Sequence, residues 1–482
     1  MRRSAGAAVA GFVGMALVVL GVAQPGSPFT SKLAASWIFG LPGPGSDPAR
    51  HALVGIAVVY SGLIVVLCAW YWIARDPTPD DRCGWARSWG VFGLWVTPLV
   101  VAPPLFSRDV YTYGAEGELV SRGIDPYTHG LASVRGSTFY ELADPLWRHA
   151  HAPYGPVFFD IARLNAHVSS SVFVTLEGYR LVALLGVVVM GVSVPVLARS
   201  LGRDPATAFA LSALNPLVLL SLIGAMHNDA LMVGLLVAGV TVARRGHPVL
   251  GVVVCALGAL VKVPCFLGIV FIGWDWAPPP DPPTRRRAAY VAGSVGIGLA
   301  VMALVSEVSG LGWNWLWNLS DPGKVNSWLD PATAIGLGIS HLVAVVGGGT
   351  DTHALVTASR AVALGVAGVI VVVLLHRCEH LGLARALGWS LLAVVFLGPV
   401  VWPWYETWGL VFLALASDVW SSRVVLVASA VACFATVPSH LRANASEVVV
   451  AAAILVVAAG GAGYSLTRVR ASVGAEHGHT HS

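Results

Sequence analysis

Residues 51–74 read HALVGIAVVYSGLIVVLCAWYWIA, a run without one Lys, Arg, Asp or Glu. A helix needs about 20 mostly apolar residues to cross the hydrocarbon core of a bilayer. Apolar runs of this kind recur along the chain, at about 5–24, 51–74, 90–106, 172–198, 207–224, 229–243, 249–261, 264–277, 288–306, 353–375, 386–401, 407–420, 424–438 and 446–465. We therefore expect an all-α, polytopic integral membrane protein with about 14 transmembrane helices.

The composition supports a membrane protein and excludes several other classes. Of the 482 residues, 56% are hydrophobic and 11% are charged, whereas a soluble domain has about 25% charged residues. A mean hydropathy of +0.74 over the whole length is too high for a soluble or a disordered chain. The net charge of +4 comes from scattered basic residues, so no patch for nucleic acid is expected.

The positions of the basic residues predict which loops face the cytoplasm. Cytoplasmic loops of membrane proteins carry an excess of Lys and Arg. With the N-terminus inside, alternating helices place 17 of the 29 basic residues there: Arg2, Arg3, Arg75, Arg82, Arg87, Arg199, Arg203, Arg244, Arg245, Arg285, Arg286, Arg287, Arg377, Arg385, Arg423, Arg468 and Arg470. The run at 5–24 is expected to be an uncleaved span, with a signal peptide as the alternative. Residues 331–348 break the alternation, so we expect a re-entrant helix on the outer side.

The longest outer segment, residues 107–171, begins with a candidate catalytic helix. Ser107 is a suitable N-cap, and Gly123 and Pro126 mark the end, which predicts a helix over 108–122. One face of this helix is expected to carry Asp109, Thr112, Tyr113, Glu116 and Val120. We expect it to lie along the membrane interface, and we expect a second interfacial helix at about 156–168. Asp109 could simply complement the helix dipole, but Arg108 and Asp109 follow an apolar run closely, which favours a functional role.

Two further polar features lie at membrane depth. His227, Asn228 and Asp229 form a polar turn between two apolar runs, where they face a cavity or cap the next helix. Lys262 stands alone beside Pro264 in an apolar tract, as in the broken helices that line polar membrane sites. Few acidic residues are near it in the sequence, so a ligand phosphate is the expected partner. The alternative is that Lys262 extends to the membrane surface.

Aromatic residues gather in two outer segments, 312–328 and 398–408. An aromatic belt at the membrane interface explains such residues, but Trp404 and Tyr405 also suit the C–H faces of a sugar. Arg442 in the last outer turn is a candidate for a second anion contact. His149 and His151 have the wrong spacing for a zinc pair, and the His-rich tail at 477–481 is expected to be solvated, so no metal site is predicted.

Three classes of function fit these features: a membrane glycosyltransferase that uses a lipid-linked donor, a transporter or flippase, and a structural membrane protein. Transporters place polar sites at the midplane between inverted repeats, and this sequence shows no convincing repeat. A structural protein has no need for Lys262 or for the polar turn at 227–229.

Several motifs, taken in order, resemble one family. These motifs are Ser107-Arg108-Asp109-Val110-Tyr111, Gly123-Ile124-Asp125-Pro126-Tyr127, Tyr154-Gly155-Pro156, His227-Asn228-Asp229-Ala230-Leu231-Met232, and Gly398-Pro399 through Pro403-Trp404-Tyr405. They are similar to those of the actinobacterial polyprenol-phosphomannose-dependent α-(1→6)-mannopyranosyltransferases, which are GT-C membrane glycosyltransferases. The similarity spans about residues 90–440.

The resemblance implies a division of the chain. It places a GT-C-like catalytic module at 90–306, with its first long outer loop at 107–171, after two additional N-terminal helices at 1–89. A C-terminal transmembrane region at 307–465, with outer aromatic loops, and a cytoplasmic tail at 466–482 would follow. The two additional helices depart from the simplest GT-C plan, and Trp402 before Pro403 leaves the sugar contact there in doubt.

The resemblance also implies a reaction and its residues. Mannose would pass with inversion from a polyprenyl-phosphate donor to a mannoside or lipoglycan acceptor, in an α-(1→6) linkage, without a cofactor or a metal. Asp109 would be the catalytic base, and Lys262, Arg108 and Arg442 would bind the donor phosphate. Sugar or acceptor contacts would come from Glu116, Tyr154, His227, Asn228, Asp229, Trp404 and Tyr405. The enzyme would be a multi-pass protein of the plasma membrane with an extracytoplasmic site; the alternative function is a transporter or flippase of lipid-linked sugars.

Overall fold

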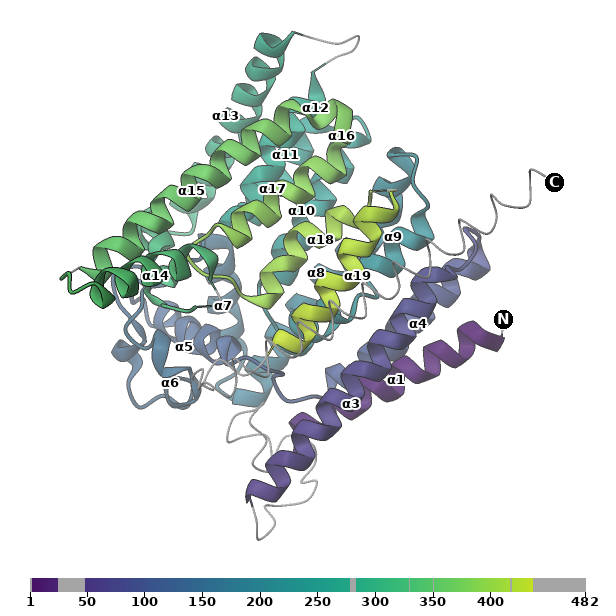
Figure 1. Cartoon of the computed structure of the whole chain (residues 1–482), viewed down its shortest axis with the longest axis horizontal. Coiled ribbons are helices and arrows are strands. Elements are labelled where there is room, and N and C mark those ends of the chain that lie inside the picture. Colours follow the sequence, from purple (N-terminus) through teal and green to yellow (C-terminus); the bar gives the residue numbers. More distant parts are fainter. Residues whose placement is uncertain are drawn as a thin grey trace.

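The computed structural model describes residues 2–24, 48–277, 283–328, 330–349, 351–416 and 418–436, and every regular element within them is a helix (Figure 1). The predicted all-α class is therefore confirmed for this part of the chain. Arg442, the apolar run at 446–465 and the C-terminal tail lie outside the described residues.

The predicted apolar runs before residue 437 coincide with helices. They correspond to α1 (Arg2–Val22), α3 (Pro48–Arg75), α4 (Arg82–Val100), α8 (Val172–Ser200), α9 (Pro205–Ser212) with the π-helix η3 (Val218–Gly224), α10 (Asp229–Arg244), α11 (Pro248–Ala259), α12 (Phe266–Trp276), α13 (Thr284–Val308), α15 (Thr352–His376), α17 (Leu383–Phe396), α18 (Thr407–Leu413) and α19 (Val419–Ala435). Five described helices are long and apolar enough to cross a membrane, or six if η3 and α10, bent by 118°, form one broken span. The expected count of about 14 crossings is therefore not confirmed.

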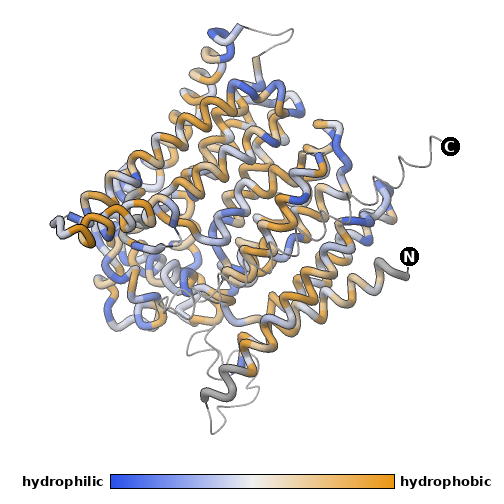
Figure 2. Tube along the Cα trace, in the orientation of Figure 1, coloured by the Kyte–Doolittle hydropathy of each residue, from blue (hydrophilic) through white to orange (hydrophobic). Residues whose placement is uncertain are grey.

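The surface of the long helices is apolar. Leu304 on α13 is 65% exposed, and Val362 and Val369 on α15 are 68% and 64% exposed. Figure 2 shows hydrophobic residues along the lengths of the helices and hydrophilic residues mostly at their ends. An apolar surface of this extent is unfavourable in water and favourable against lipid chains, so the structure is consistent with a membrane protein.

Three short helices bring distant residues together. α10, α11 and α12 are about 24, 18 and 16 Å long at 1.5 Å per residue, less than the hydrocarbon thickness of about 30 Å. At one end, Arg244 of α10 binds Asp275 of α12 at 2.9 Å. At the other end, Asp229 at the start of α10 meets Lys262 after α11. α10 and α11 run antiparallel, so the start of α10 and the turn after α11 lie at the same depth in the helix bundle. Asp229 and Lys262 therefore meet there.

Shorter helices gather on one side of the molecule, at the left of the view in Figure 1. They are α5 (Asp109–Ser121), α6 (Thr138–Leu142), α7 (Pro156–Val168) and α14 (Pro331–Val345), the last of which packs through Gly336 against α15. The helices predicted at 108–122 and 156–168 are confirmed, and Gly123 follows α5 at φ +72°. The position of α5 relative to the membrane stays a prediction, but the helix is not exposed: ten of its 13 residues are buried, because α6, α7 and α8 cover it.

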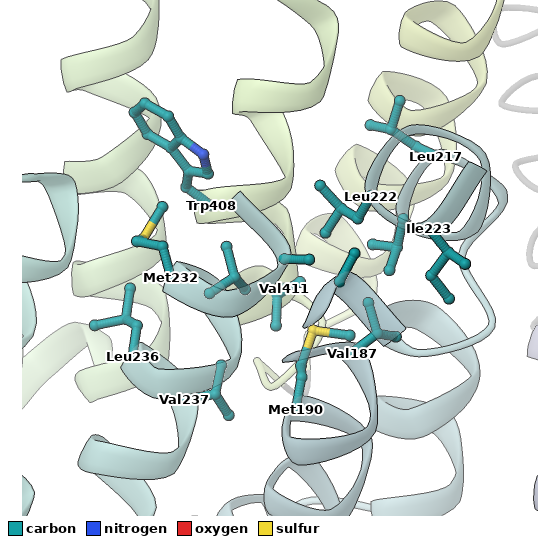
Figure 3. Close-up of a cluster of buried hydrophobic side chains, with 14 of the residues drawn as sticks. Val187, Met190, Leu217, Leu222, Ile223, Met232, Leu236, Val237, Trp408 and Val411 are labelled. Atoms are coloured by element: carbon teal, nitrogen blue, oxygen red, sulfur yellow. The ribbon is translucent and has the colours of Figure 1, made fainter. Parts of the chain in front are cut away.

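A dense apolar core fixes α10 against its neighbours. Figure 3 shows side chains from α8, η3, α10 and α18 facing one another, among them Met190, Ile223, Leu236 and Val411. α8 and α10 touch through glycine: a Cβ on Gly186 would overlap the carbonyl of Ala230 one residue after Asp229. Close backbone approach through small residues is the usual way in which helices pack inside membranes.

This contact predicts that Gly186→Ala is destabilising although alanine favours helices. The new methyl group must displace α10, and overpacking of this kind costs about 1–3 kcal/mol. The measurement is the thermal unfolding midpoint of the purified protein in detergent, with Gly293→Ala on α13, where the added Cβ meets open space, as the matched control. A midpoint for Gly186→Ala equal to or above that of the control would contradict the described contact.

Candidate active site

A cavity of about 200 Å³ lies where α5, the turn after α11 and the segment at 398–408 meet. Its polar wall consists of Asp109, Thr112, Glu116, His151, Tyr154, Lys262 and Tyr405, with the indoles of Trp147, Trp402 and Trp408. The other lining residues are mainly apolar: Ala150, Pro153, Val263, Pro264, Leu319, Val394, Val395, Gly398, Pro399 and Val400. The cavity lining thus combines charged and aromatic groups with aliphatic ones.

The first turn of α5 presents a carboxylate to this cavity. The predicted N-cap Ser107 is wrong by one position, because the N-cap residue is Arg108, whose side chain makes no capping hydrogen bond. Ser107 still lies at the start of the helix, where its hydroxyl accepts a hydrogen bond of 3.1 Å from the Asp109 backbone N–H. Asp109, Thr112 and Glu116 line the cavity together, which confirms that they share a face. Tyr113, expected on the same face, instead packs edge-on against Tyr154, with ring centroids 5.6 Å apart.

The two acids of this face have unusual proton affinities. Burial raises the pKa of Asp109 to about 6, against the opposing effect of the positive charge on Lys262. Glu116 is 4% exposed, and burial, together with the nearby charge of Asp109, raises its pKa well above the ordinary value. Burial therefore favours the protonated form of Glu116, whereas a pKa of about 6 leaves Asp109 available as a base near neutral pH.

Lys262, which lines the cavity, forms a buried ion pair with Asp229. Lys262 Nζ lies 2.9 Å from both carboxylate oxygens of Asp229, whose side chain is fully buried. The indole N–H of Trp408 donates to Asp229 Oδ1 at 2.6 Å. The expectation that Lys262 lacks an acidic partner in the chain is wrong. Its partner is 33 positions away in the sequence, and only the antiparallel packing of α10 and α11 brings the two together.

Aromatic rings surround the ammonium group of Lys262. Nζ lies 4.2 Å from the ring centroid of Tyr405, 5.4 Å from that of Trp408 and 6.0 Å from that of Tyr154. Cation–π contacts of this kind are worth about 0.5–2 kcal/mol each when water is excluded. They help to hold Nζ at the cavity, which all three aromatic residues line.

The polar turn at 227–229 does not line the cavity, but its side chains contact residues around the cavity. His227 does not line the cavity, and its Nε2 lies 3.6 Å from Asp109 Oδ2. Asn228 accepts a long hydrogen bond of 3.5 Å from the Tyr113 hydroxyl. Asp229 is covered by Lys262 and Trp408. These three residues are thus close to Asp109, Tyr113 and Lys262, and act on the cavity through them.

The aromatic segment at 398–408 differs in detail from what the sequence predicts. Trp402 and Tyr405 line the cavity, whereas Trp404 is 6% exposed and lies between two rings. It stacks on His227 with centroids 4.0 Å apart and on Trp402 with centroids 5.1 Å apart. Of these two neighbouring tryptophans, the one that lines the cavity is therefore Trp402, the residue for which the family pattern gave no role.

The structure does not place the other two predicted phosphate contacts, Arg108 and Arg442, at the cavity. Arg108 is half-buried next to Asp109 and does not line the cavity, and Arg442 lies outside the described residues. The sequence reasoning missed Trp408 and Arg180. Trp408 follows Tyr405 by three positions, a spacing that puts both on one helical face. Arg180 on α8 donates to the carbonyls of Leu99 and Ala102 and fixes the segment that leads to Asp109.

Within the described residues, no group of three or more His, Cys, Asp or Glu side chains is placed to hold a metal ion. The charged groups around the cavity are instead arranged in pairs: Asp109 with His227, and Asp229 with Lys262.

Comparison with known proteins matches most of the chain to alpha-(1→6)-mannopyranosyltransferases. The family model described as alpha-(1→6)-mannopyranosyltransferase, N-terminal domain, matches residues 8–278, and that of the MptB C-terminal domain matches residues 332–464. A probable alpha-(1→6)-mannopyranosyltransferase of Mycolicibacterium smegmatis is 33% identical over 78% of this chain and 72% of its own length. Alpha-(1→6)-mannopyranosyltransferase A of Mycobacterium tuberculosis is 31% identical over 88% of this chain and 82% of its own length. Alpha-(1→6)-mannopyranosyltransferase B of Corynebacterium glutamicum is 30% identical over 69% of this chain and 58% of its own length. No solved structure matches the chain.

The ion pair predicts a specific pattern of stabilities. Lys262→Met leaves the Asp229 charge buried without a counter-charge, which costs about 3–5 kcal/mol. Asp229→Asn combined with Lys262→Met removes both charges and is expected to recover most of this loss. The measurement is a double-mutant cycle of thermal unfolding in detergent; single and double variants of equal stability would contradict a coupled buried pair.

Proposed function

The chain belongs to the alpha-(1→6)-mannopyranosyltransferase family, and we propose that it transfers mannose from polyprenyl-phosphate mannose to a mannoside or lipoglycan acceptor, forming an α-(1→6) linkage with inversion. The names of its relatives support mannosyltransferase activity, and its apolar helices support a membrane location. The observation that carries the finer proposal is a cavity whose lining combines a carboxylate, a lysine and aromatic rings with aliphatic residues, here called the aliphatic wall.

Asp109 is the proposed catalytic base. Its carboxylate removes the proton from the 6-hydroxyl of the acceptor while that oxygen bonds to the anomeric carbon, and the bond from this carbon to the phosphate oxygen breaks with its electron pair. A pKa of about 6 leaves Asp109 unprotonated at neutral pH and close to the best value for a general base. Since the product is α-linked, a displacement with inversion requires a β-linked mannosyl phosphate.

Lys262 is the proposed phosphate contact. Two of the three N–H groups of an ammonium can serve the two Asp229 oxygens, and one remains for a ligand. Negative charge grows on the departing phosphate oxygens during the reaction, so a fixed lysine at the cavity strengthens its interaction in the transition state. Arg108 and Arg442 are the further proposed phosphate contacts.

The aliphatic wall is the proposed place for the first isoprene units of the donor. Val263 and Pro264 follow Lys262 directly in the chain, so a phosphate at Lys262 has apolar surface beside it. Val394, Val395 and Pro399 complete this wall. A soluble sugar nucleotide would gain nothing from such a surface, whereas a polyprenyl chain buries its own apolar atoms there.

The sugars are proposed to bind against the aromatic and acidic side. Glu116, Tyr154, Tyr405 and Trp402 line the cavity and offer hydrogen bonds or flat faces, while His227, Asn228, Asp229 and Trp404 hold them in position. We place this site on the extracytoplasmic face of the plasma membrane, because the loops near α5 carry fewer basic residues than those at the other end. No cofactor or metal is part of the proposal.

Asp109→Asn is predicted to lower kcat by about 10²–10⁴, the usual contribution of a general base. The amide has nearly the shape of the acid, so donor binding and folding are expected to persist. The assay combines purified protein, a panel of polyprenyl-phosphate sugars and a mannoside acceptor, with identification of the product linkage. Asp160→Asn on α7, which pairs with Arg163 away from the cavity, is the control.

Turnover of Asp109→Asn at the rate of the native protein would remove Asp109 from the mechanism. If the native protein forms no product with any donor but moves lipid-linked sugar across vesicle membranes, the flippase alternative is correct.

The pH dependence of kcat/KM is predicted to show an acid limb near pH 6. Asp109 must be unprotonated to accept a proton, and its raised pKa of about 6 means that activity falls as the pH drops through this value. Glu116→Gln should retain this limb, because the proposed titrating group is Asp109, and burial raises the pKa of Glu116 well above its ordinary value. A limb at the ordinary value for aspartate, or its loss in Glu116→Gln, would show that the titrating group is not Asp109.

A further inference from the structure

Two strained loops meet behind the cavity. Among the described residues, only Phe106 and Met226 are non-glycine residues with positive φ, at 62° and 61°. Phe106 lies three residues before Asp109, and Met226 lies directly before His227. The loops are joined by a hydrogen bond of 3.1 Å from the Leu105 N–H to the Gly224 carbonyl. Such conformations cost about 1–3 kcal/mol each and concentrate at functional sites, so both loops are built to place particular side chains.

The side chains that they place are Asp109 and His227. His227 Nδ1 lies 2.8 Å from the carbonyl oxygen of Ser221, which lies within the π-helix η3. A carbonyl can only accept, so Nδ1 carries the hydrogen, and the other nitrogen of the neutral ring has a free lone pair. The stack on Trp404 prevents the ring from tilting away. The tautomer and the orientation of the ring are therefore both fixed.

The free lone pair is directed at the proposed base. His227 Nε2 is buried without a hydrogen-bond partner and lies 3.6 Å from Asp109 Oδ2. This separation exceeds that of a hydrogen bond, as expected for a carboxylate oxygen and a lone pair with no proton between them. A single proton would join the two atoms, and a small side-chain movement would close the gap.

Resting on the proposed function, we propose that His227 receives the proton that Asp109 removes from the acceptor hydroxyl. As the acceptor oxygen bonds to the anomeric carbon, its proton passes to Asp109 Oδ2 and on to His227 Nε2. The electron pair of the broken bond stays on the phosphate. The result is an imidazolium–carboxylate pair, so Asp109 keeps its negative charge beside the anomeric carbon while positive charge develops there. The proton then leaves to the product phosphate, whose second pKa is about 6, or to water.

Other charged groups around Asp109 determine the electrostatic environment of the Asp109–His227 pair. Asp109 interacts electrostatically with Lys262, Asp144 and Asp229, and Glu116 lies about two turns further along α5. Lys262 and Asp229 neutralise one another. The pair of Asp109 and His227 therefore starts with one net negative charge and becomes neutral when it takes up the proton.

Chemical rescue separates a proton-transfer role from a packing role. We expect His227→Ala to lower kcat by about 100-fold, at the lower end of the range for acid–base groups, with little change in the donor KM. Added imidazole should restore part of the rate in proportion to its unprotonated form. Trp404→Leu, which removes the stack and keeps Nε2, is the matched control and should not respond to imidazole. A His227→Ala variant with native kcat would overturn the proposal.

A second measurement does not depend on turnover. The full-length protein with ¹⁵N-labelled histidine contains 15 histidines, and the His227 signal is assigned by its loss in His227→Gln. We expect a neutral ring with the proton on Nδ1, and a shift of the Nε2 resonance in Asp109→Asn, whose amide can donate to it. A proton on Nε2, or no response to Asp109→Asn, would overturn the proposal even if a variant misfolds. An inactive native protein with the expected histidine signals would contradict the proposed function alone.

Discussion

The ion pair between Lys262 and Asp229 is the interaction on which the site depends. Separating two such charges from water is costly unless they are paired and hydrogen-bonded, and here Asp229 has Lys262 and Trp408 as partners. The pair ties the start of α10 to the turn after α11 and to α18. Because these elements also carry the polar turn at 227–229 and the aromatic segment at 398–408, the pair fixes the cavity as a whole.

The ion pair also explains how the cavity can hold an anion without carrying a large charge of its own. Lys262 is neutralised in the free protein, and its aromatic neighbours keep Nζ in place. In the proposed mechanism, a lipid phosphate would add a third partner to Lys262 without displacing Asp229. The proposed base Asp109 lines the same cavity, so the attacking and leaving groups would have separate contacts.

The sequence predicts the helices well and their contacts only in part. The apolar runs and end signals were sufficient to place α5, α7 and most of the apolar helices within one or two residues, because helix ends follow local signals such as Gly123, although the N-cap of α5 is Arg108 and not Ser107. Asp109, Glu116, Tyr154, Lys262 and Tyr405 were also expected at one site, and the cavity contains them. The partnership of Lys262 with Asp229 and the exchange of roles between Trp402 and Trp404 depend on tertiary packing, which spacing along one helix does not encode. The burial of α5 was missed because its polar residues face a cavity instead of water.

The central claim is an inverting transfer from a lipid phosphate in this cavity. The most direct test is to supply the purified protein with β-mannosyl polyprenyl phosphate and a short mannoside, and to determine the new linkage by NMR spectroscopy. The account predicts an α-(1→6) linkage and one polyprenyl phosphate released for each mannose transferred. A β linkage, or transfer only from a soluble sugar nucleotide, would contradict it.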